Sequence, residues 1–546
     1  MKNLSYVIVL SGLAATLVGC GGGGGGMSSP PPANSYGWVL IENSIPFFIV
    51  DTSIDLYGEA FSDNPTQYTP TNCPIGADNS MTVTWANKTA NTSGYGYLGY
   101  WLAYGIFGQP ECQHRWSANV PVAVGTNNIA VTVTGSTMFG SSPILITREL
   151  VTSPTWTRQF GSSGDESGNS VDVDTSGNAY VAGSTTGSLG GIANAGGIDY
   201  FLIKYDTSGN TVWVRQGGSA SDDIATGVAV GTDGSIYLAG HTWGSLDGNP
   251  SFGGWDIFIA KYDPSGNRLW ISQTGSANND NANGLAVDNI GNVYIAGKTS
   301  YSTSTTLTSY ALLLKYDTSG NLLWSHQLSS STATETGYGV AVDGNGNIFL
   351  TGTTSGSLDG NPNTGHQGAF LGKYDANGNQ LWILQDRVFN AIRSGVAVDA
   401  SGNVYITGSQ DPQRIFGSGA IFVNKYDAQG IKLWSWSLYP SVGTGFDGYG
   451  GNGIAVGSDG SVYAAGYYFG SDVTAYAGMD SYLVKLDGNG NKLWSSYQGN
   501  NPYQNAAYGV ATDMNGNVFV TGYTAGSFND QVLAGGRDAF LMKYTP

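Results

Sequence analysis

The amino-acid sequence predicts an all-β chain in which a β-sandwich precedes a closed seven-bladed β-propeller. The main observation is that the segment Gly402–Gly408 recurs seven times with small changes, at intervals of 55 to 58 residues. A long fixed period indicates a repeat architecture. Four short strand patterns accompany each copy, and four antiparallel strands per repeat are typical of propeller blades. The other copies begin at Gly177, Gly234, Gly291, Gly346, Gly460 and Gly516.

The composition agrees with short strands joined by tight turns. Of the 546 residues, 83 are glycine and only 11% are charged, against about 25% in an ordinary soluble domain. Aromatic residues make up 12% of the chain, which argues against disorder. A formal net charge of −18 makes nucleic acid or an anionic membrane surface an unsuitable main partner.

Residues 1–19 have the features of an export signal. Lys2 supplies a positive start, and the apolar run that follows is too short to span a bilayer. The run ends in Leu17-Val18-Gly19-Cys20, which resembles the lipobox of bacterial lipoproteins. That resemblance implies lipidation at Cys20, and glycine at position 21 favours the outer membrane. Residues 20–35, rich in glycine and proline, then form a tether.

Residues 36–150 lack the repeat and show alternating strand patterns. Such patterns occur at 54–61, 81–85, 116–122 and 128–134. Together with signposts such as Trp116-Ser117-Ala118-Asn119-Val120-Pro121, they resemble bacterial Ig-like sandwich domains. Cys73 and Cys112 are an even pair in a chain expected to be exported, so we expect a disulfide between them.

Residues 151–546 contain the seven predicted blades. The fifth repeat divides into strands a, b, c and d at 395–399, 404–407, 421–427 and 432–435. The seventh repeat stops after strand c, whereas an extra strand d lies in front of the first repeat at 155–161. We therefore expect this front strand to complete the last blade, which also pairs an open sheet edge. These repeats resemble the SBBP (seven-bladed beta-propeller) repeat family of bacterial surface proteins, whose biochemistry is little established.

Residues that recur in every blade are expected to be structural. A lysine occupies one strand-c position in all seven blades, and we expect its stem to lie along a neighbouring aromatic ring. The Asp-x-x-Gly-Asn turns, such as 343–347, space oxygen atoms at alternate positions and make calcium a candidate ligand. They lack the glycine and the distal glutamate of an EF-hand loop, so they also suit plain tight turns.

The b–c and d–a connections share one face of a propeller, and departures from the repeat gather there. An aspartate precedes strand c in blades one, two, six and seven, which are contiguous in a closed ring, so one half of the face is expected to be acidic. Blades three to five carry Tyr310, Gly368 and Ala420 instead. The aspartates are Asp199, Asp256, Asp480 and Asp538.

Two groups on this face are candidate ligand-binding residues. Arg387, Arg393 and Arg414 belong to blade five, where arginine forks suit carboxylates, sulfates or phosphates, or else pair with local acids. Trp243, Phe252 and Trp255 belong to the b–c loop of blade two. Exposed aromatics there suit sugar stacking or partner contacts, or else they cap the blade.

The sequence favours a binding role without catalysis. Its four histidines show no metal-like spacing, and neither a Ser-His-Asp set nor a carboxylate pair stands out, so no catalytic or metal residue is assigned. We expect an envelope lipoprotein that binds a protein or a polysaccharide. Two alternatives stay open: a polysaccharide- or glycoside-acting enzyme with its site in the propeller funnel, and a structural spacer.

The expected disulfide has a direct test. If Cys73 and Cys112 are bridged, the purified ectodomain titrated with a thiol reagent in denaturant should contain no free thiol until a reductant is added. A count of two free thiols before reduction would contradict the pairing.

Overall fold

The computed structural model describes the propeller region almost completely and the N-terminal region by its strands. The described residues are 153–302, 307–330, 333–358, 360, 367–386, 392–410, 419–439, 448–469, 478–499, 503–528 and 531–546, together with nine strands within 1–152. The chain divides into two compact units, Met1–Thr152 and Ser153–Pro546. Within the described part, no helix has the length and apolar character needed to cross a membrane.

The N-terminal unit contains two antiparallel sheets. One has the strand order β1-β2-β3-β7-β6 and the other β5-β4-β8-β9. All four strand patterns expected from the sequence fall on strands, namely β3, β4, β7 and β8. The strands are β1 (Tyr6–Val7), β2 (Trp38–Asn43), β3 (Ser53–Phe61), β4 (Thr82–Asn87), β5 (Thr92–Tyr95), β6 (Tyr97–Tyr104), β7 (Pro110–Pro121), β8 (Gly125–Thr134) and β9 (Ile144–Leu150).

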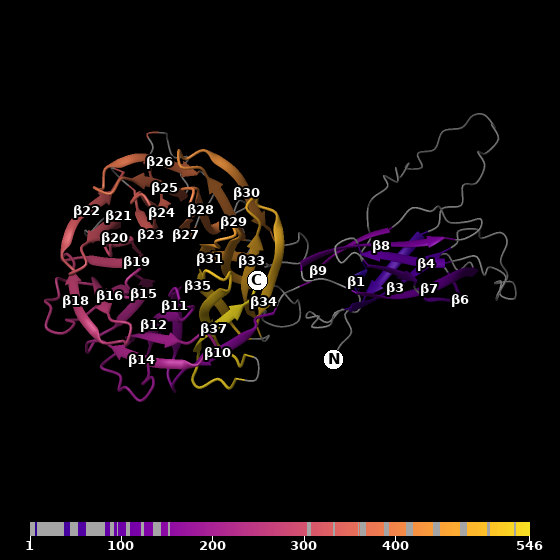
Figure 1. The fold of residues 1–546 in the computed structure, drawn as a ribbon, viewed down its shortest axis with the longest axis horizontal. Helices are drawn as coiled ribbons and strands as arrows, with labels where there is room; N and C mark the ends of the chain where they lie inside the picture. Colours follow the sequence, from indigo (N-terminus) through magenta and orange to yellow (C-terminus); the bar gives the residue numbers. More distant parts are fainter. Residues whose placement is uncertain are drawn as a thin grey trace. The chain divides into compact units, whose positions relative to one another are not determined.

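The second unit is a seven-bladed propeller of four-stranded antiparallel sheets, as predicted (Figure 1). The innermost strands, a, are β11 (Glu166–Val173), β15 (Asp223–Val230), β19 (Asn279–Val287), β23 (Glu335–Val342), β27 (Ile392–Val398), β31 (Gly448–Val456) and β35 (Asn505–Thr512). Strands b are β12 (Ala179–Thr185), β16 (Ile236–Thr242), β20 (Val293–Ser302), β24 (Ile348–Thr354), β28 (Val404–Gln410), β32 (Val462–Phe469) and β36 (Val518–Thr524).

The outer half of each blade consists of strands c and d. Strands c are β13 (Asp199–Tyr205), β17 (Asp256–Tyr262), β21 (Leu307–Tyr316), β25 (Gly368–Tyr374), β29 (Ala420–Tyr426), β33 (Met479–Leu486) and β37 (Asp538–Tyr544). Strands d are β14 (Thr211–Gly217), β18 (Arg268–Thr274), β22 (Leu322–Leu328), β26 (Gln380–Asp386), β30 (Lys432–Leu438), β34 (Lys492–Gln498) and β10 (Trp156–Phe160).

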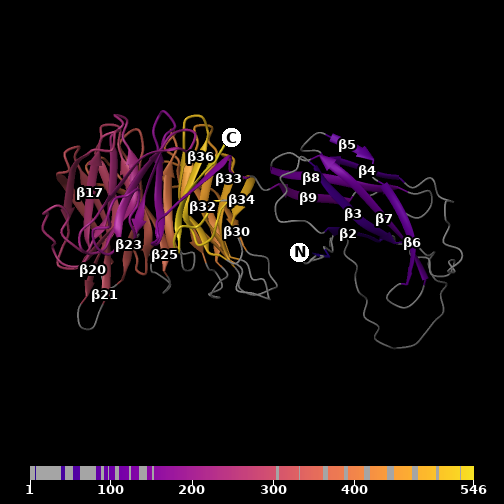
Figure 2. The ribbon, with the colours of Figure 1, turned by 90° about the horizontal axis from the view of Figure 1, so that it is seen from below.

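The inner strands form a closed circle. Each inner strand contacts the inner strand of the next blade, and β35 of blade seven contacts β11 of blade one (Figure 1). Seen edge-on, the strands cross the thickness of the ring, and the β20–β21 hairpin reaches past one face (Figure 2). Apolar side chains of strands b and c fill the layers between blades, so the core is divided into one packet per blade interface.

The predicted completion of the last blade is confirmed. β10 pairs antiparallel with β37, from Trp156 opposite Lys543 to Phe160 opposite Ala539. Both aromatic side chains pack against the buried cluster between blades seven and one. The Phe160 ring meets the Phe201 ring edge-on at 5.5 Å, and Arg158 Nε donates to the Gly209 carbonyl of blade one at 2.7 Å. The closing strand therefore completes one blade and also contacts the next.

Inner strands are joined by a repeated side-chain hydrogen bond. Each inner strand has a register shift, and in blades one, three and six the shifted residue is an asparagine. The amide nitrogens of Asn169, Asn283 and Asn452 each donate at 2.8 Å to a carbonyl in the next inner strand. The bulges thus have a structural role, because each one directs an asparagine side chain toward the next blade.

The tight turns follow the chemistry expected of Asp-x-x-Gly-Asn. In blade five, Asp399 N–H donates to the Asn403 carbonyl at 3.0 Å, and Gly402 N–H donates to the Asp399 carbonyl at 2.9 Å. Gly402 has a φ of 80°, which side chains other than glycine rarely tolerate. The turn sequence thus fixes the hairpin between strands a and b.

Deletion of residues 155–161 should lower the stability of the propeller severely. The loss removes the ladder to β37 and the packing of Trp156 and Phe160, and large aromatic truncations in a core cost about 3–5 kcal/mol each. The measurement is the melting temperature of the deletion variant by circular dichroism. An unchanged melting temperature would show that the ring does not depend on this strand.

Candidate functional site

Exposed aromatic side chains gather on the face formed by the b–c and d–a connections. In the described part of the chain, five large aromatic side chains are exposed. All five lie in or beside one of these connections. The exposed aliphatic side chains lie mainly elsewhere, in outer strands such as β18 (Leu269) and in turns of the opposite face (Ile290, Met514). The five aromatics, 43–50% exposed, are Trp243, Phe252, Tyr301, Tyr439 and Tyr503.

A Gly-Gly-X-Asp sequence ends the b–c loop in blades one, two and seven, at 196–199, 253–256 and 535–538. The glycines lie against the following d–a loop. A Cβ on Gly253 would lie 2.6 Å from the backbone of Ala277, and one on Gly254 would lie 2.0 Å from Asn279 Oδ1. The paired glycines therefore let the two loops of neighbouring blades touch.

The aspartate of this sequence is buried, so the expectation of an acidic half-face is wrong. Asp199, Asp256 and Asp538 are at most 1% exposed, and Asp480 is only half-buried. Asp256 Oδ2 accepts from Phe252 N at 2.8 Å and from Gln273 Nε2 at 2.9 Å. Asp199 and Asp538 make the same two contacts with their own loops and glutamines. Each carboxylate points inward because it satisfies the loop backbone.

Residue X, by contrast, displays its side chain on a fixed backbone. In blade two X is Trp255, whose N–H donates to Asn279 Oδ1 at 3.1 Å and whose carbonyl accepts from Asp280 N at 2.6 Å. The corresponding backbone carbonyl bond occurs at Ile198 of blade one and at Arg537 of blade seven. We call this position the display site of a blade. Its backbone is held by the next blade, whereas its side chain differs among these three blades.

Trp243 and His241 join Trp255 in one cluster. The indole rings of Trp243 and Trp255 meet edge-on, with centroids 5.4 Å apart at 85°, and the His241 ring meets Trp255 at 4.8 Å and 86°. Trp243 N–H donates to the Asp222 carbonyl at 2.8 Å, so its backbone is also held. Burial lowers the pKa of His241 to about 4, and the charge of Lys298 acts in the same direction. His241 is therefore a neutral partner for the indole at pH 7.

A second aromatic cluster, Tyr301 with Tyr310, belongs to blade three. Their ring centroids are 5.5 Å apart. In β16 and β17 the side chains of Tyr237, Ala239, Ile257 and Ile259 pack on Val293 and Ile295 of β20. By strand alternation, His241 and Trp255 face blade three while Tyr301 faces back toward blade two. Both clusters thus border the same blade interface, which we call the two–three seam.

The structure places the predicted aromatic residues on the expected face and leaves the predicted arginines untested. Trp243 and Trp255 are in contact, whereas Phe252 of the same loop is 45% exposed. Arg387 and Arg414 lie outside the described residues, and Arg393 is described only as part of the β27 backbone. Cys20 and Cys73 also lie outside, and Cys112 is described only as part of β7.

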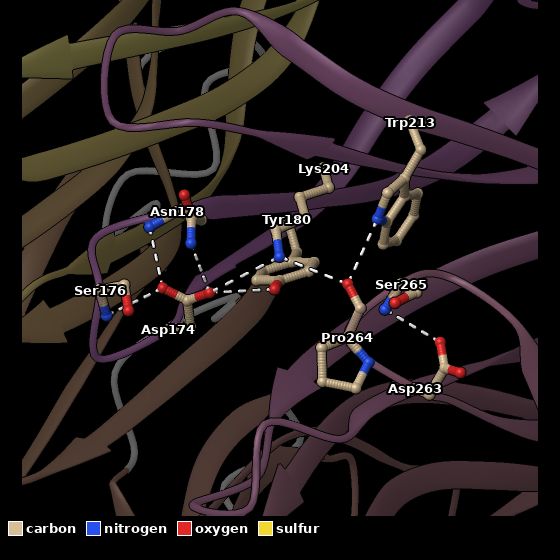
Figure 3. A network of polar contacts seen from close by, with 9 residues as sticks. All are labelled: Asp174, Ser176, Asn178, Tyr180, Lys204, Trp213, Asp263, Pro264 and Ser265. Carbon is tan, nitrogen blue, oxygen red and sulfur yellow. Dashed lines mark hydrogen bonds and ion pairs between the residues drawn. The ribbon is translucent and has the colours of Figure 1, made fainter.

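On the opposite face, the recurring lysine is confirmed as a packing element. Lys204 Nζ lies 5.0 Å from the ring centroid of Tyr180 and donates to the Pro264 carbonyl of blade two at 3.4 Å (Figure 3). Trp213 Nε1 donates to the same carbonyl at 3.4 Å. The equivalent lysine lies over an aromatic ring in all seven blades. The cation–π contact joins two strands of one blade, and the carbonyl bond links that blade to the next.

The turns on that face are held by hydrogen bonds to their aspartates. Asp174 Oδ1 accepts from Ser176 N at 3.0 Å and from Asn178 N at 2.9 Å, and Oδ2 accepts from Tyr180 Oη at 3.0 Å (Figure 3). Calcium at such turns stays a prediction. Within the described part of the chain, no group of three or more His, Cys, Asp or Glu side chains is arranged to hold a metal ion.

Sequence reasoning missed His241, Tyr301 and Tyr310 as members of the site. From the sequence, Tyr310 is notable only because it replaces an aspartate. Its contact with Tyr301 depends on the register of β20 and β21. The Gly-Gly-X-Asp repeat was a usable signal, since it marks the display site by three shared residues around one variable residue. The alternation of β16 then places His241 beside it.

Asp172 is a second departure from the repeat, at the centre of the ring. The other six inner strands have alanine at this position. Asp172 Oδ2 accepts from Val230 N of blade two at 2.8 Å, and Oδ1 accepts from Val173 N at 2.8 Å. Burial outweighs these bonds and raises the pKa of Asp172 to about 6. Its charged form is therefore costly in the folded protein at neutral pH.

Comparisons with known proteins support the repeat. A family model described as SBBP, beta-propeller repeat, matches residues 155–190, 269–300, 323–359 and 493–529. An uncharacterized WD repeat-containing protein of Acanthamoeba polyphaga mimivirus is 24% identical over 442 residues, covering 59% of this chain and 31% of that protein. Regulatory protein FlaEY of Caulobacter vibrioides is 28% identical over 149 residues, covering 24% and 16%. The chain thus spans less than a third of either relative.

The chain matches solved structures only distantly, in both fold and sequence. The exotype rhamnogalacturonan lyase YesX is 11% identical, with a TM-score of 0.34 and coverage of 89% of this chain and 87% of that chain. A thermostable family-43 glycoside hydrolase is 14% identical, with a TM-score of 0.28 and coverage of 49% and 93%. Values this low carry no argument about activity. The chain contains SBBP beta-propeller repeats that build a seven-bladed propeller.

Replacement of Asp172 should change stability in a pH-dependent way. The pKa is raised from 3.8 to about 6 on folding, so this group stabilises the fold below pH 4 and loses that contribution as the pH rises through 6. The melting temperature of Asp172→Asn, relative to the unmodified protein, should therefore rise between pH 4 and pH 7.

A control with the opposite shift is Asp174→Asn. Burial acts to raise the pKa of Asp174, but hydrogen bonds from Asn178, Tyr180 and Ser176 outweigh it and hold the pKa below 3.8. The difference in melting temperature between Asp174→Asn and the unmodified protein should not change from pH 5 to pH 7. If the difference for Asp172→Asn also stays constant from pH 4 to pH 7, the raised pKa of Asp172 is contradicted.

Proposed function

We propose that this SBBP-repeat propeller is a non-catalytic binding module of the bacterial cell envelope. The observation that carries the proposal is that the described exposed aromatics lie on a single face, the one built from b–c and d–a connections. Exposed aromatic side chains supply large contact area with few rotatable bonds, so they are favoured where a protein binds a partner. The partner is an envelope protein or a polysaccharide.

The display sites make this face suitable for binding. Trp255 and Trp243 have backbones fixed by hydrogen bonds to neighbouring loops, and their indoles support each other. Side chains held in place before binding lose less conformational entropy when a partner arrives. The same backbone bond at Ile198 and Arg537 shows that the scaffold offers equivalent positions in other blades.

Sequence features of the remaining chain support a position at a membrane for this module. The lipobox-like sequence at Cys20 supports a lipid anchor, and the segment 20–35 supports a tether that holds the folded part away from the lipid. The two antiparallel sheets of the N-terminal unit support an Ig-like sandwich as a spacer. The even pair of cysteines, Cys73 and Cys112, supports a bridge within it. The propeller would then face partners at the outer membrane without contacting lipid.

A pull-down from envelope extract tests the proposal. The bait is residues 21–546, with proteins and glycans both analysed, and it is compared with a Trp243→Ala/Phe252→Ala variant and an Arg387→Ala/Arg393→Ala/Arg414→Ala variant. Loss of a captured partner in the aromatic variant is the expected result, because the exposed indole and phenyl rings supply the contact.

A surface control for this experiment is Met514→Ala. Met514 is 76% exposed on the opposite face, so its replacement should leave capture intact. Loss only in the arginine variant would keep the binding role and move the site to blade five. Capture of nothing by the unmodified bait would contradict the proposal and favour the spacer or the enzyme.

A further inference from the structure

We propose that the two–three seam binds successive pyranose rings of a neutral polysaccharide chain. This inference rests on the proposed function and specifies its ligand. The seam has Trp243 and Trp255 on its blade-two side and Tyr301 and Tyr310 on its blade-three side. Aromatic side chains on both sides are available to stack on one sugar ring or on neighbouring rings of a chain.

Asn279 fixes the two sides relative to each other. Its Oδ1 accepts from Trp255 N at 3.1 Å, and its backbone pairs with Ser300, the residue before Tyr301. Asn279 therefore connects both sides of the seam. Its side chain bonds to the backbone of Trp255, and its backbone belongs to the strand pair that carries Tyr301. The spacing of the aromatic clusters is set before any ligand arrives.

The chemistry of the seam matches a sugar. The pyranose ring has C–H groups on its faces and hydroxyl groups at its edge. Trp243 is 49% exposed and Tyr301 is 43% exposed, so ring surface is available for the C–H faces. The d–a loop that crosses the seam, residues 275–279, carries two asparagines, whose side-chain amides contain both donors and acceptors as hydroxyls require.

The loop also favours a neutral ligand. Residues 275–279 contain no charged side chain, and the nearby Asp280 is 5% exposed, with its Oδ2 held by Ser276 at 2.7 Å. His241 is neutral at pH 7, as its lowered pKa requires. A uronic acid chain would find no matched cation on this loop. The net charge of −18 would also oppose a polyanion at long range.

The seams beside the other two display sites lack this combination. The display site of blade one is Ile198, and the residue equivalent to Trp243 there is Thr186. The display site of blade seven is Arg537, whose guanidinium lies 4.8 Å from the ring centroid of Tyr523. Of these three seams, only the two–three seam has indoles on one side and phenols on the other. Among the three display sites, the sugar site is thus expected only at that of blade two.

Affinity electrophoresis of the full chain tests the inference. Native gels contain xylan, glucomannan, galactan, dextran or starch as neutral polymers, or polygalacturonate as an acidic one. At least one neutral polymer should retard the chain, and polygalacturonate should not. Oligosaccharides of the retarding polymer are then titrated by calorimetry into Trp243→Ala and Tyr301→Ala, and each should weaken binding by about tenfold or more, as expected for central aromatic contacts.

Two further variants are matched controls. Trp243→Phe keeps an aromatic face and should bind more tightly than Trp243→Ala. Tyr439→Ala removes an exposed aromatic of the same face in blade five and should bind like the unmodified chain. Melting temperatures of all variants should agree with the unmodified chain, because both test residues are about half exposed.

The outcomes separate the two proposals. Retention of full sugar affinity in both Trp243→Ala and Tyr301→Ala, or loss in Tyr439→Ala instead, overturns the seam and keeps the binding module. A protein partner lost with Trp243, with no polymer retarding the chain, also overturns the sugar ligand and keeps the proposed function. Failure of every polymer together with an empty pull-down overturns both.

Discussion

The propeller depends on the pairing of β10 with β37. Without this pairing, blade seven would end in an unpaired strand c, and the buried cluster between blades seven and one would lose the Trp156 and Phe160 rings that pack against it. Neighbouring blades are joined by inner-strand contacts around the ring, and lysine-to-carbonyl bonds and asparagine bridges add to several of these interfaces. These bonds hold a circle only when the circle is complete. Lys543 of blade seven, which donates to the Thr207 carbonyl of blade one at 3.2 Å, has its partner in place because the ring is closed.

The two faces of the ring use the repeat differently. On the face of the a–b and c–d turns, aspartate, glycine, lysine and tryptophan recur with nearly the same contacts, and their polar groups are directed into the turns and the blade interfaces. On the face of the b–c and d–a connections, the recurring residues are Gly-Gly and Asp, which hold the loop backbone and leave one position variable. Recurring side-chain contacts are therefore concentrated on one face, and variable side chains are concentrated on the other.

The fold was predictable from the sequence because its signals are local and repeated. The spacing of Gly402-like turns, the four strand patterns and the surplus strand at 155–161 together specified seven blades and their closure. The burial of Asp199 and Asp256 was not predictable in that way. A charged residue before a strand reads as exposed unless its hydrogen-bond partners are known, and Gln216 and Gln273 lie a whole strand away. The candidate site was found only in part for a similar reason. Trp243 and Trp255 stand out in a loop, but their relation to Tyr301 depends on which side of each strand faces the seam.

A consequence of the display sites concerns how such a protein diverges. The backbone of residue X is held by main-chain and asparagine or aspartate contacts that do not involve its own side chain, as at Ile198, Trp255 and Arg537. Substitution at X therefore changes what the face presents without removing a bond that holds the blades together. Folding and recognition are encoded by different residues of the same four-residue segment. Selection can change the side chain at one of these three display sites while the other two keep theirs, so a single gene carries three separately adjustable positions on one scaffold.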